Sequence, residues 1–150
     1  MLFRSEKVVK ATTLTSEKVD LKRYSEIILV PRNDFDKGMV QKLGIAKEAI
    51  DLEQLQTRIV QANLTDKVPG VVDRIGISNA ARYYKPFLWV RYDFGGQVRG
   101  KEAKLIVTEA DTQKDVFVAS IPLDYIWAGV NDQNARYPLY NALLEDRKST

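Results

Sequence analysis

The chain of 150 residues contains no cysteine and no histidine. Without cysteine it can form no disulfide, and it offers no thiol nucleophile and no thiolate ligand for zinc or an iron–sulfur cluster. Without histidine it lacks the commonest general base and every serine–histidine or cysteine–histidine pair. We therefore expect no metal site and no cofactor, and any hydrolytic chemistry would have to use carboxylates or a lysine.

Long apolar runs are also missing. The longest aliphatic run is Ile-Ile-Leu-Val at residues 27–30, far short of the roughly 18 apolar residues that span a bilayer. The chain also has only a small excess of one charge over the other, since 23 basic and 20 acidic residues leave a net charge of +3. The charges are interspersed, which is typical of a solvated surface and unlike the concentrated basic stripe of most nucleic-acid-binding proteins.

What is present suits one globular domain. The length is ordinary for a single domain, and 45% hydrophobic with 29% charged residues is a globular composition. Residues 1–22 are polar and rich in charge, and we interpret them as an N-terminal extension or linker. Residues 23–150 are then the single domain.

Hydrophobic patterning predicts the first elements of that domain. Residues 27–30 predict a buried strand that Pro31 ends. Asp51 and Gln54 have the spacing of a capping box, and the apolar residues after them recur at helical spacing, so a helix is expected from residue 51. We expect a loop at residues 33–38, a short strand at 71–77 and a single helical turn at 78–81.

Alternating patterns predict the second half of the fold. Residues 84–94, 103–109 and 116–121 read as three strands of an antiparallel meander. Pro138 suits the first turn of a last helix, which would carry Leu139, Ala142 and Leu143 inward. The expected fold class is α+β: a strand, a helix, a three-stranded antiparallel meander and a C-terminal helix, forming a two-layer sandwich.

Three motifs favour turns over functional sites. The glycine-rich residues 95–100 lie between two expected strands, whereas a phosphate-binding loop needs a helix after it. Asp34 and Asp36 are out of register for an EF-hand loop. Asp111 and Asp115 flank a turn, where solvated carboxylates are far commoner than a catalytic pair.

Aromatic and cationic residues interleave over residues 82–92. One side of the expected strand carries four candidate partner-binding residues: Lys85, Phe87, Trp89 and Arg91. If this side were exposed, its aromatics and arginine would suit a protein interface or, less well, base stacking in nucleic acid. If helices cover it, the aromatics are core and the cations reach solvent along their stems. We favour Phe87 and Arg91 as contacts and the core interpretation for Trp89.

A second segment, residues 124–141, is dense in amides and aromatics. Between a strand and a helix, such side chains can line a small pocket. The candidate pocket residues are Trp127, Asn131, Asn134 and Tyr137. The structural alternative, which we favour, is that the amides cap the last helix and hold its loop.

Residues 20–31, Asp-Leu-Lys-Arg-Tyr-Ser-Glu-Ile-Ile-Leu-Val-Pro, resemble the opening of small periplasmic domains of Gram-negative lipoproteins of unknown function. There a polar linker leads through an Asp-x-x-x-Tyr phrase into the first strand, and the later order of elements is similar also. The resemblance implies a binding or scaffolding role in the periplasm or at the inner face of the outer membrane. The lipid-carrying cysteine of such proteins is absent, so the resemblance implies an anchor upstream of residue 1.

The expected function is that of a non-enzymatic binding or scaffolding domain of the bacterial cell envelope, with a protein partner or a second copy of the chain. Membrane contact is expected only through the implied lipid anchor. A cytosolic nucleic-acid-binding module is the alternative, although nucleic acid is the less favoured partner. An enzyme that relies on carboxylates comes third.

Overall fold

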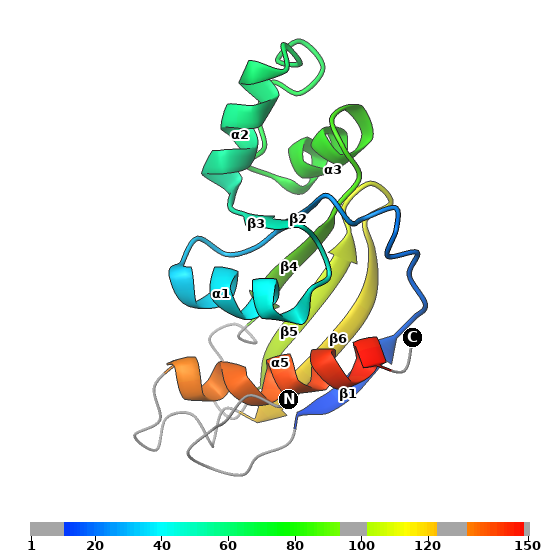
Figure 1. Ribbon diagram of the computed structural model, residues 1–150, viewed down its shortest axis with the longest axis vertical. Coiled ribbons are helices and arrows are strands. Elements are labelled where there is room, and N and C mark those ends of the chain that lie inside the picture. The colour runs from blue at the N-terminus through cyan, green and yellow to red at the C-terminus, as the bar shows by residue number, and fades with distance from the viewer. Residues whose placement is uncertain (1–10, 94–101, 123–131, 149–150) are drawn as a thin grey trace. The chain divides into compact units, whose positions relative to one another are not determined.

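The computed structural model describes residues 11–93, 102–122 and 132–148 (Figure 1). The chain divides into two compact units. Unit 1 comprises Met1–Lys18, Arg91–Ile106 and Val116–Thr150, and unit 2 comprises Val19–Val90 and Val107–Asp115. Among the described residues, no helix is long and apolar enough to cross a membrane.

The strands form a six-stranded mixed sheet in the order β1-β6-β5-β4-β2-β3. Strand β2 pairs in parallel with β3 and β4, whereas β1 pairs antiparallel with β6. The strands are β1 (Thr12–Ser16), β2 (Ile27–Leu29), β3 (Glu48–Ile50), β4 (Leu88–Asp93), β5 (Glu102–Glu109) and β6 (Lys114–Pro122). The α+β class is thus confirmed, and the predicted element order was incomplete. Strands β4, β5 and β6 are neighbours, as a meander requires, while their antiparallel meander and the two-layer sandwich stay predictions.

Helix α1 (Asp34–Leu43) occupies a segment of unit 2 whose first residues were predicted to be a loop, and that prediction is wrong. The Asn33 side chain caps the helix by accepting a hydrogen bond from the Asp36 backbone N–H at 2.7 Å. The helix ends at Gly44, whose φ of 68° is the left-handed conformation that glycine adopts readily. Asparagine and aspartate favour both loops and helix caps, so composition alone misled the assignment.

Helix α2 (Leu52–Gln61) begins as the sequence predicts. The Gln54 backbone N–H donates to Asp51 Oδ1 at 2.9 Å, and the Asp51 backbone N–H donates to Gln54 Oε1 at 3.1 Å. This is a complete capping box. The predicted apolar stripe of Leu52, Leu55, Ile59 and Ala62 is confirmed at Leu55 and Ile59, which are fully buried, whereas Leu52 and Ala62 are exposed.

Helix α3 (Arg74–Tyr83) replaces the strand predicted at 71–77 and extends the predicted single turn to ten residues. Asp73 caps it by accepting a hydrogen bond from the Gly76 backbone N–H at 2.7 Å. A Cβ at Gly76 would lie 2.1 Å from the Gly70 carbonyl oxygen, so only glycine permits this close approach. Tyr84 ends the helix as its C-cap, and β4 therefore begins at Leu88 instead of residue 84.

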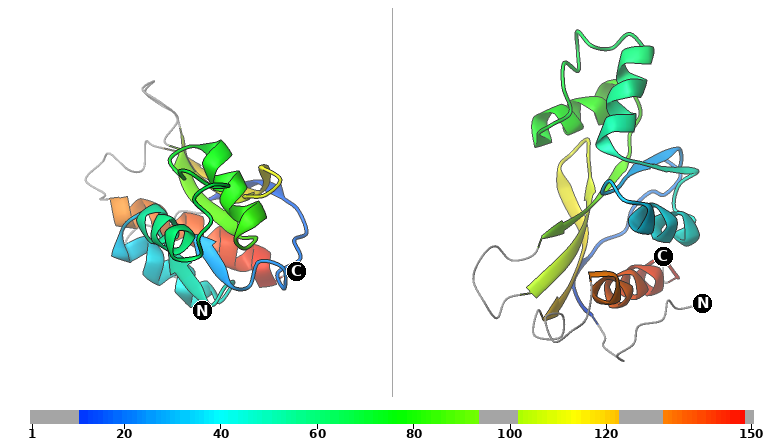
Figure 2. Two further views of the ribbon diagram at one scale, coloured as in Figure 1. Left: turned by 90° about the horizontal axis from the view of Figure 1, so that it is seen from above. Right: turned by 90° about the vertical axis from the view of Figure 1, so that its left-hand side faces the viewer.

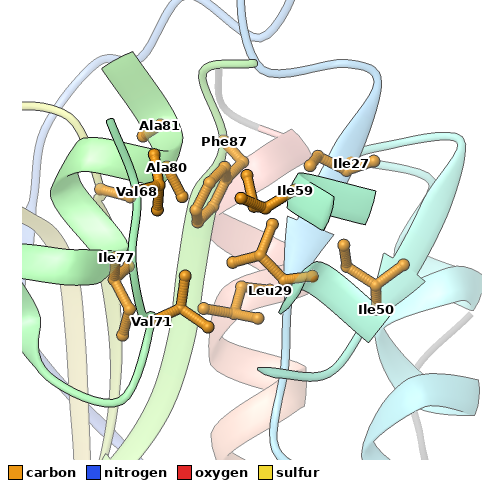
Figure 3. Close-up of a cluster of buried hydrophobic side chains, with 12 residues drawn as sticks. Ile27, Leu29, Ile50, Ile59, Val68, Val71, Ile77, Ala80, Ala81 and Phe87 are labelled. Atoms are coloured by element: carbon orange, nitrogen blue, oxygen red, sulfur yellow. The ribbon is translucent and has the colours of Figure 1, made fainter. Parts of the chain in front are cut away.

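The core of unit 2 gathers side chains from β2, β3, α2 and α3 together with Phe87 (Figure 3). In that view Phe87 lies between Ala80 of α3 and Ile59 of α2. The buried cluster consists of Ile27, Leu29, Ile50, Leu55, Ile59, Val68, Val71, Ile77, Ala80, Ala81, Phe87 and Ala110. Helices α2 and α3 are thus held mainly by apolar burial, which is the dominant favourable contribution to folding.

Unit 1 contains β1, most of β6 and helix α5 (Asp132–Lys148). Within the predicted N-terminal extension, residues 12–16 form β1, an edge strand that pairs with β6. Pro138 lies inside α5 and not in its first turn. In Figures 1 and 2, α5 lies across one face of the strands of this unit. It buries Leu139 and Leu143 as predicted, whereas Ala142 is half-buried.

Candidate binding surface

The predicted partner-binding face lies largely on the core side of unit 2. Phe87 has no exposed surface, so its favoured role as a contact residue is wrong for this fold. Trp89 is half-buried and packs against the same core cluster, in line with the core interpretation. The physical reason is that α2 and α3 cover this side of the strand, which is the covered-sheet alternative considered above.

The two cations of that face have separate surroundings. Lys85 is half-buried, and its Nζ lies 5.5 Å from the centre of the Tyr84 ring. The hydrogen bond from Arg58 and the charge of Arg58 lower the pKa of Glu48, and the charge of Lys85 lowers it further. Arg91 is half-buried on β4 and belongs to unit 1. Partner binding by Lys85, Trp89 and Arg91 stays a prediction.

The predicted pocket falls mostly outside the described residues. Trp127 and Asn131 lie outside them, and so does the side chain of Asn134. The backbone of Asn134 is helical, near the start of α5, and Tyr137 is half-buried one turn later. The segment from residue 132 is therefore helix and not the loop that the pocket prediction assumed.

The most exposed aliphatic residues of unit 2 lie just before and at the start of α3. Val72 is 91% exposed and Ile75 is 68% exposed, and Tyr83, two turns later, is 50% exposed. Asn79 lies between Ile75 and Tyr83 at helical spacing, so these residues share one face of the helix. We name Val72, Ile75, Asn79 and Tyr83 the α3 surface. Sequence reasoning missed it, because Val71, Ile75 and Ile77 had been assigned to a strand.

The backbone beneath the α3 surface is held on several sides. Val68 and Val71, just before it, are buried in the core cluster. Gly76 packs against the carbonyl of Gly70, and its N–H is bound by the Asp73 carboxylate. Val72 and Ile75 are thus presented on a fixed corner between a loop that is anchored in the core by Val68 and Val71 and a capped helix.

Cations surround this surface. Lys67 Nζ lies 5.2 Å from the centre of the Tyr83 ring, and the Arg74 guanidinium lies 5.8 Å from that of Trp89. The Arg82 side chain donates through Nε to the Asp111 backbone carbonyl at 3.3 Å. This hydrogen bond to Asp111 holds the C-terminal end of α3 in place.

A buried polar cluster in unit 2 supports the same helix. The Tyr24 hydroxyl donates to Glu109 Oε2 at 2.8 Å, and Arg23 forms an ion pair with the Asp111 carboxylate. The Asp111 carbonyl also accepts from Ser78 Oγ on α3 at 3.2 Å. Burial, then the hydrogen bond to Glu109 and the charge of Asp111, raise the pKa of Tyr24 far above its usual value.

This cluster corrects the prediction that Asp111 is a solvated turn residue, because its side chain is buried. Its carboxylate and its carbonyl both have partners within the chain. Groups that satisfy each other in this way hold a fold together, and we assign the cluster a structural role. Within residues 11–93, 102–122 and 132–148, no group of three or more carboxylates could hold a metal ion.

Comparison with protein-family models, with curated proteins and with solved structures found no match for this chain. We therefore infer function from the chemistry of the α3 surface itself.

Proposed function

We propose that the chain is a non-enzymatic protein-binding domain and that the α3 surface is its contact site. The observation that carries the proposal is the exposure of Val72 and Ile75 on a rigid corner. Single exposed apolar residues are ordinary in soluble proteins. Apolar residues gathered on one helix face and rimmed by charges are typical of an interaction site.

The rigidity of the corner favours binding on energetic grounds. A flexible loop loses conformational entropy when a partner orders it, and that loss subtracts from the affinity. Here the cap at Asp73 and the packing of Gly76 on Gly70 have already fixed the backbone. An apolar contact at Val72 and Ile75 therefore costs little additional ordering.

The cell-envelope location, in the periplasm or at the inner face of the outer membrane, is part of the proposal and rests on the resemblance of residues 20–31 to lipoprotein domains. The non-enzymatic role rests on the lack of cysteine and histidine. The nucleic-acid alternative is less well supported, because the rings of Tyr83, Tyr84 and Trp89 each already lie beneath a cation. Such rings are less open for stacking with bases.

Site-specific photo-crosslinking in the source cells tests the proposal. A photoreactive amino acid replaces Ile75 in one variant and Gln41, an exposed residue of α1, in a matched control. We expect a discrete protein adduct at position 75 that is absent at position 41 and disappears when Val72→Ser is added. No adduct at position 75, or the same adducts at both positions, would contradict the proposal.

A further inference from the structure

The charges around the α3 surface limit which partner can dock there. We infer that its partner is an acidic amphipathic protein segment, with apolar side chains that contact Val72 and Ile75 and carboxylates that meet the surrounding cations. This inference rests on the proposed binding function and specifies the chemistry of the partner. It is supported by the charge balance around the α3 surface and by the spacing of Ile75, Asn79 and Tyr83 along one face of α3.

The charge balance is positive. Residues 66–85 contain four basic residues, Lys67, Arg74, Arg82 and Lys85, and two acidic ones, Asp66 and Asp73. The Asp73 carboxylate already accepts the hydrogen bond from the Gly76 N–H that caps α3. Lys67, Arg74 and Arg82 are exposed and stand on or beside the helix that carries Ile75 and Tyr83. Carboxylates placed opposite these cations would steer association and fix its orientation.

The spacing indicates the shape of the partner. Ile75, Asn79 and Tyr83 follow one another at intervals of four residues and form a ridge along one side of α3, and Val72 lies just before the N-cap residue Asp73. A second helix with apolar residues at matching intervals can pack along such a ridge. The small aliphatic side chains of Val72 and Ile75 leave room for larger apolar anchors from the partner.

Other occupants fit less well. In a symmetric dimer the α3 surface of one copy would face the α3 surface of the other. Arg74 and Arg82 of the two copies would then lie close together and repel each other. Anionic lipid and nucleic acid present phosphates in a continuous array, part of which would lie opposite Asp66 and Asp73, whereas a peptide can place its few carboxylates opposite the cations alone. The exposed members of the surface also include neither tryptophan nor phenylalanine, the residues that most favour a bilayer interface.

A displayed library of random peptides is the probe. Clones are selected on the wild-type chain and counter-selected on the Val72→Ser/Ile75→Ser variant. We expect the enriched peptides to contain aspartate or glutamate together with large apolar residues at helical spacing. Binding of these peptides should weaken by at least about tenfold on the Lys67→Glu/Arg74→Glu variant, which reverses two of the cations.

Each contrary result has a distinct meaning. Enrichment of lysine and arginine, or tighter binding to the charge-reversed variant, overturns the acidic-partner inference. So does a wild-type chain that dimerises, or that binds phosphatidylglycerol vesicles or duplex DNA, through Val72 and Ile75. If position 75 crosslinks to a protein whose contact segment is not acidic, the inference fails while the proposed function stands. If position 75 crosslinks to no protein, the proposed function fails.

Discussion

Helix α3 and the residues before it have two apolar faces with opposite surroundings. Val71 is 2% exposed and Val72 is 91% exposed, although they are the same residue type and adjacent in the chain. Ile77 is 3% exposed and Ile75 is 68% exposed. Residue type therefore does not decide which face is core. The Asp73 cap and the approach of Gly76 to Gly70 set the helix in the orientation that turns Val71 and Ile77 inward and Val72 and Ile75 outward.

The largest expected effect lies on the buried face. Phe87→Ala should destabilise the chain by about 3–5 kcal/mol, because it removes one of the largest fully buried side chains of the core cluster. Tyr83→Ala is the matched aromatic control on the exposed face and should cost about 1 kcal/mol or less. Urea denaturation measures both values. Equal costs for the two variants would mean that the assigned faces are wrong.

The contact that orients α3 can be tested at its glycine. Gly76→Ala should destabilise the chain by about 1–3 kcal/mol, because the new methyl group meets the Gly70 carbonyl. Gly38 in α1 is the control, since a Cβ there has nothing within 4 Å. Gly38→Ala should stabilise the chain by about 0.5–1 kcal/mol through its better helix propensity. If both substitutions stabilise the chain in thermal melting, the close approach at Gly76 does not exist.

A smaller effect is expected at the cap of α2, which carries Leu55 and Ile59 into the same core. Asp51→Ala should cost about 1 kcal/mol in urea denaturation, because it removes the acceptor for the Gln54 N–H. An unchanged midpoint would place the start of α2 elsewhere.

The same residue predicts an acid-sensitive contribution to stability. Burial alone would raise the pKa of Asp51, but the hydrogen bonds from Lys37 and Gln54 and the charges of Lys37 and Arg32 lower it below its usual value of 3.8. A group whose pKa is lower in the folded state than in the unfolded chain stabilises the fold at every pH above its unfolded pKa. This stabilisation is lost as the pH falls through the folded pKa. The cost of Asp51→Ala should therefore shrink below about pH 4. A cost that is constant from pH 7 to pH 3 would contradict this account.

Local signals explain which elements the sequence predicts correctly. The run at β2 and the capping box of α2 each involve only a few neighbouring residues, and both were confirmed. Residues 71–77, Val-Val-Asp-Arg-Ile-Gly-Ile, fit a strand by their apolar alternation. The helix forms there because Asp73 caps it and the Gly70 carbonyl approaches Gly76, and the second of these requires tertiary structure.

Long-range partners account for the remaining errors at the candidate site. Asp111 is buried because Arg23, 88 positions away in the chain, forms an ion pair with it. Phe87 is core because α2 and α3 fold over it, and no spacing within residues 84–94 reveals that cover. The α3 surface could be located only after the direction of α3 was known.

The most direct test measures binding and stability in parallel for one variant of the exposed face of α3 and one variant of its buried face. The Val72→Ser/Ile75→Ser variant is titrated with the protein that crosslinks at position 75, and its urea midpoint is measured in parallel. Val71→Ser/Ile77→Ser is the buried counterpart. We predict that the exposed pair keeps the wild-type midpoint and loses at least about tenfold in affinity, whereas the buried pair unfolds the chain or destabilises it strongly. Full affinity in the exposed pair, or a midpoint as low as that of the buried pair, would contradict the claim that the α3 surface is the binding site.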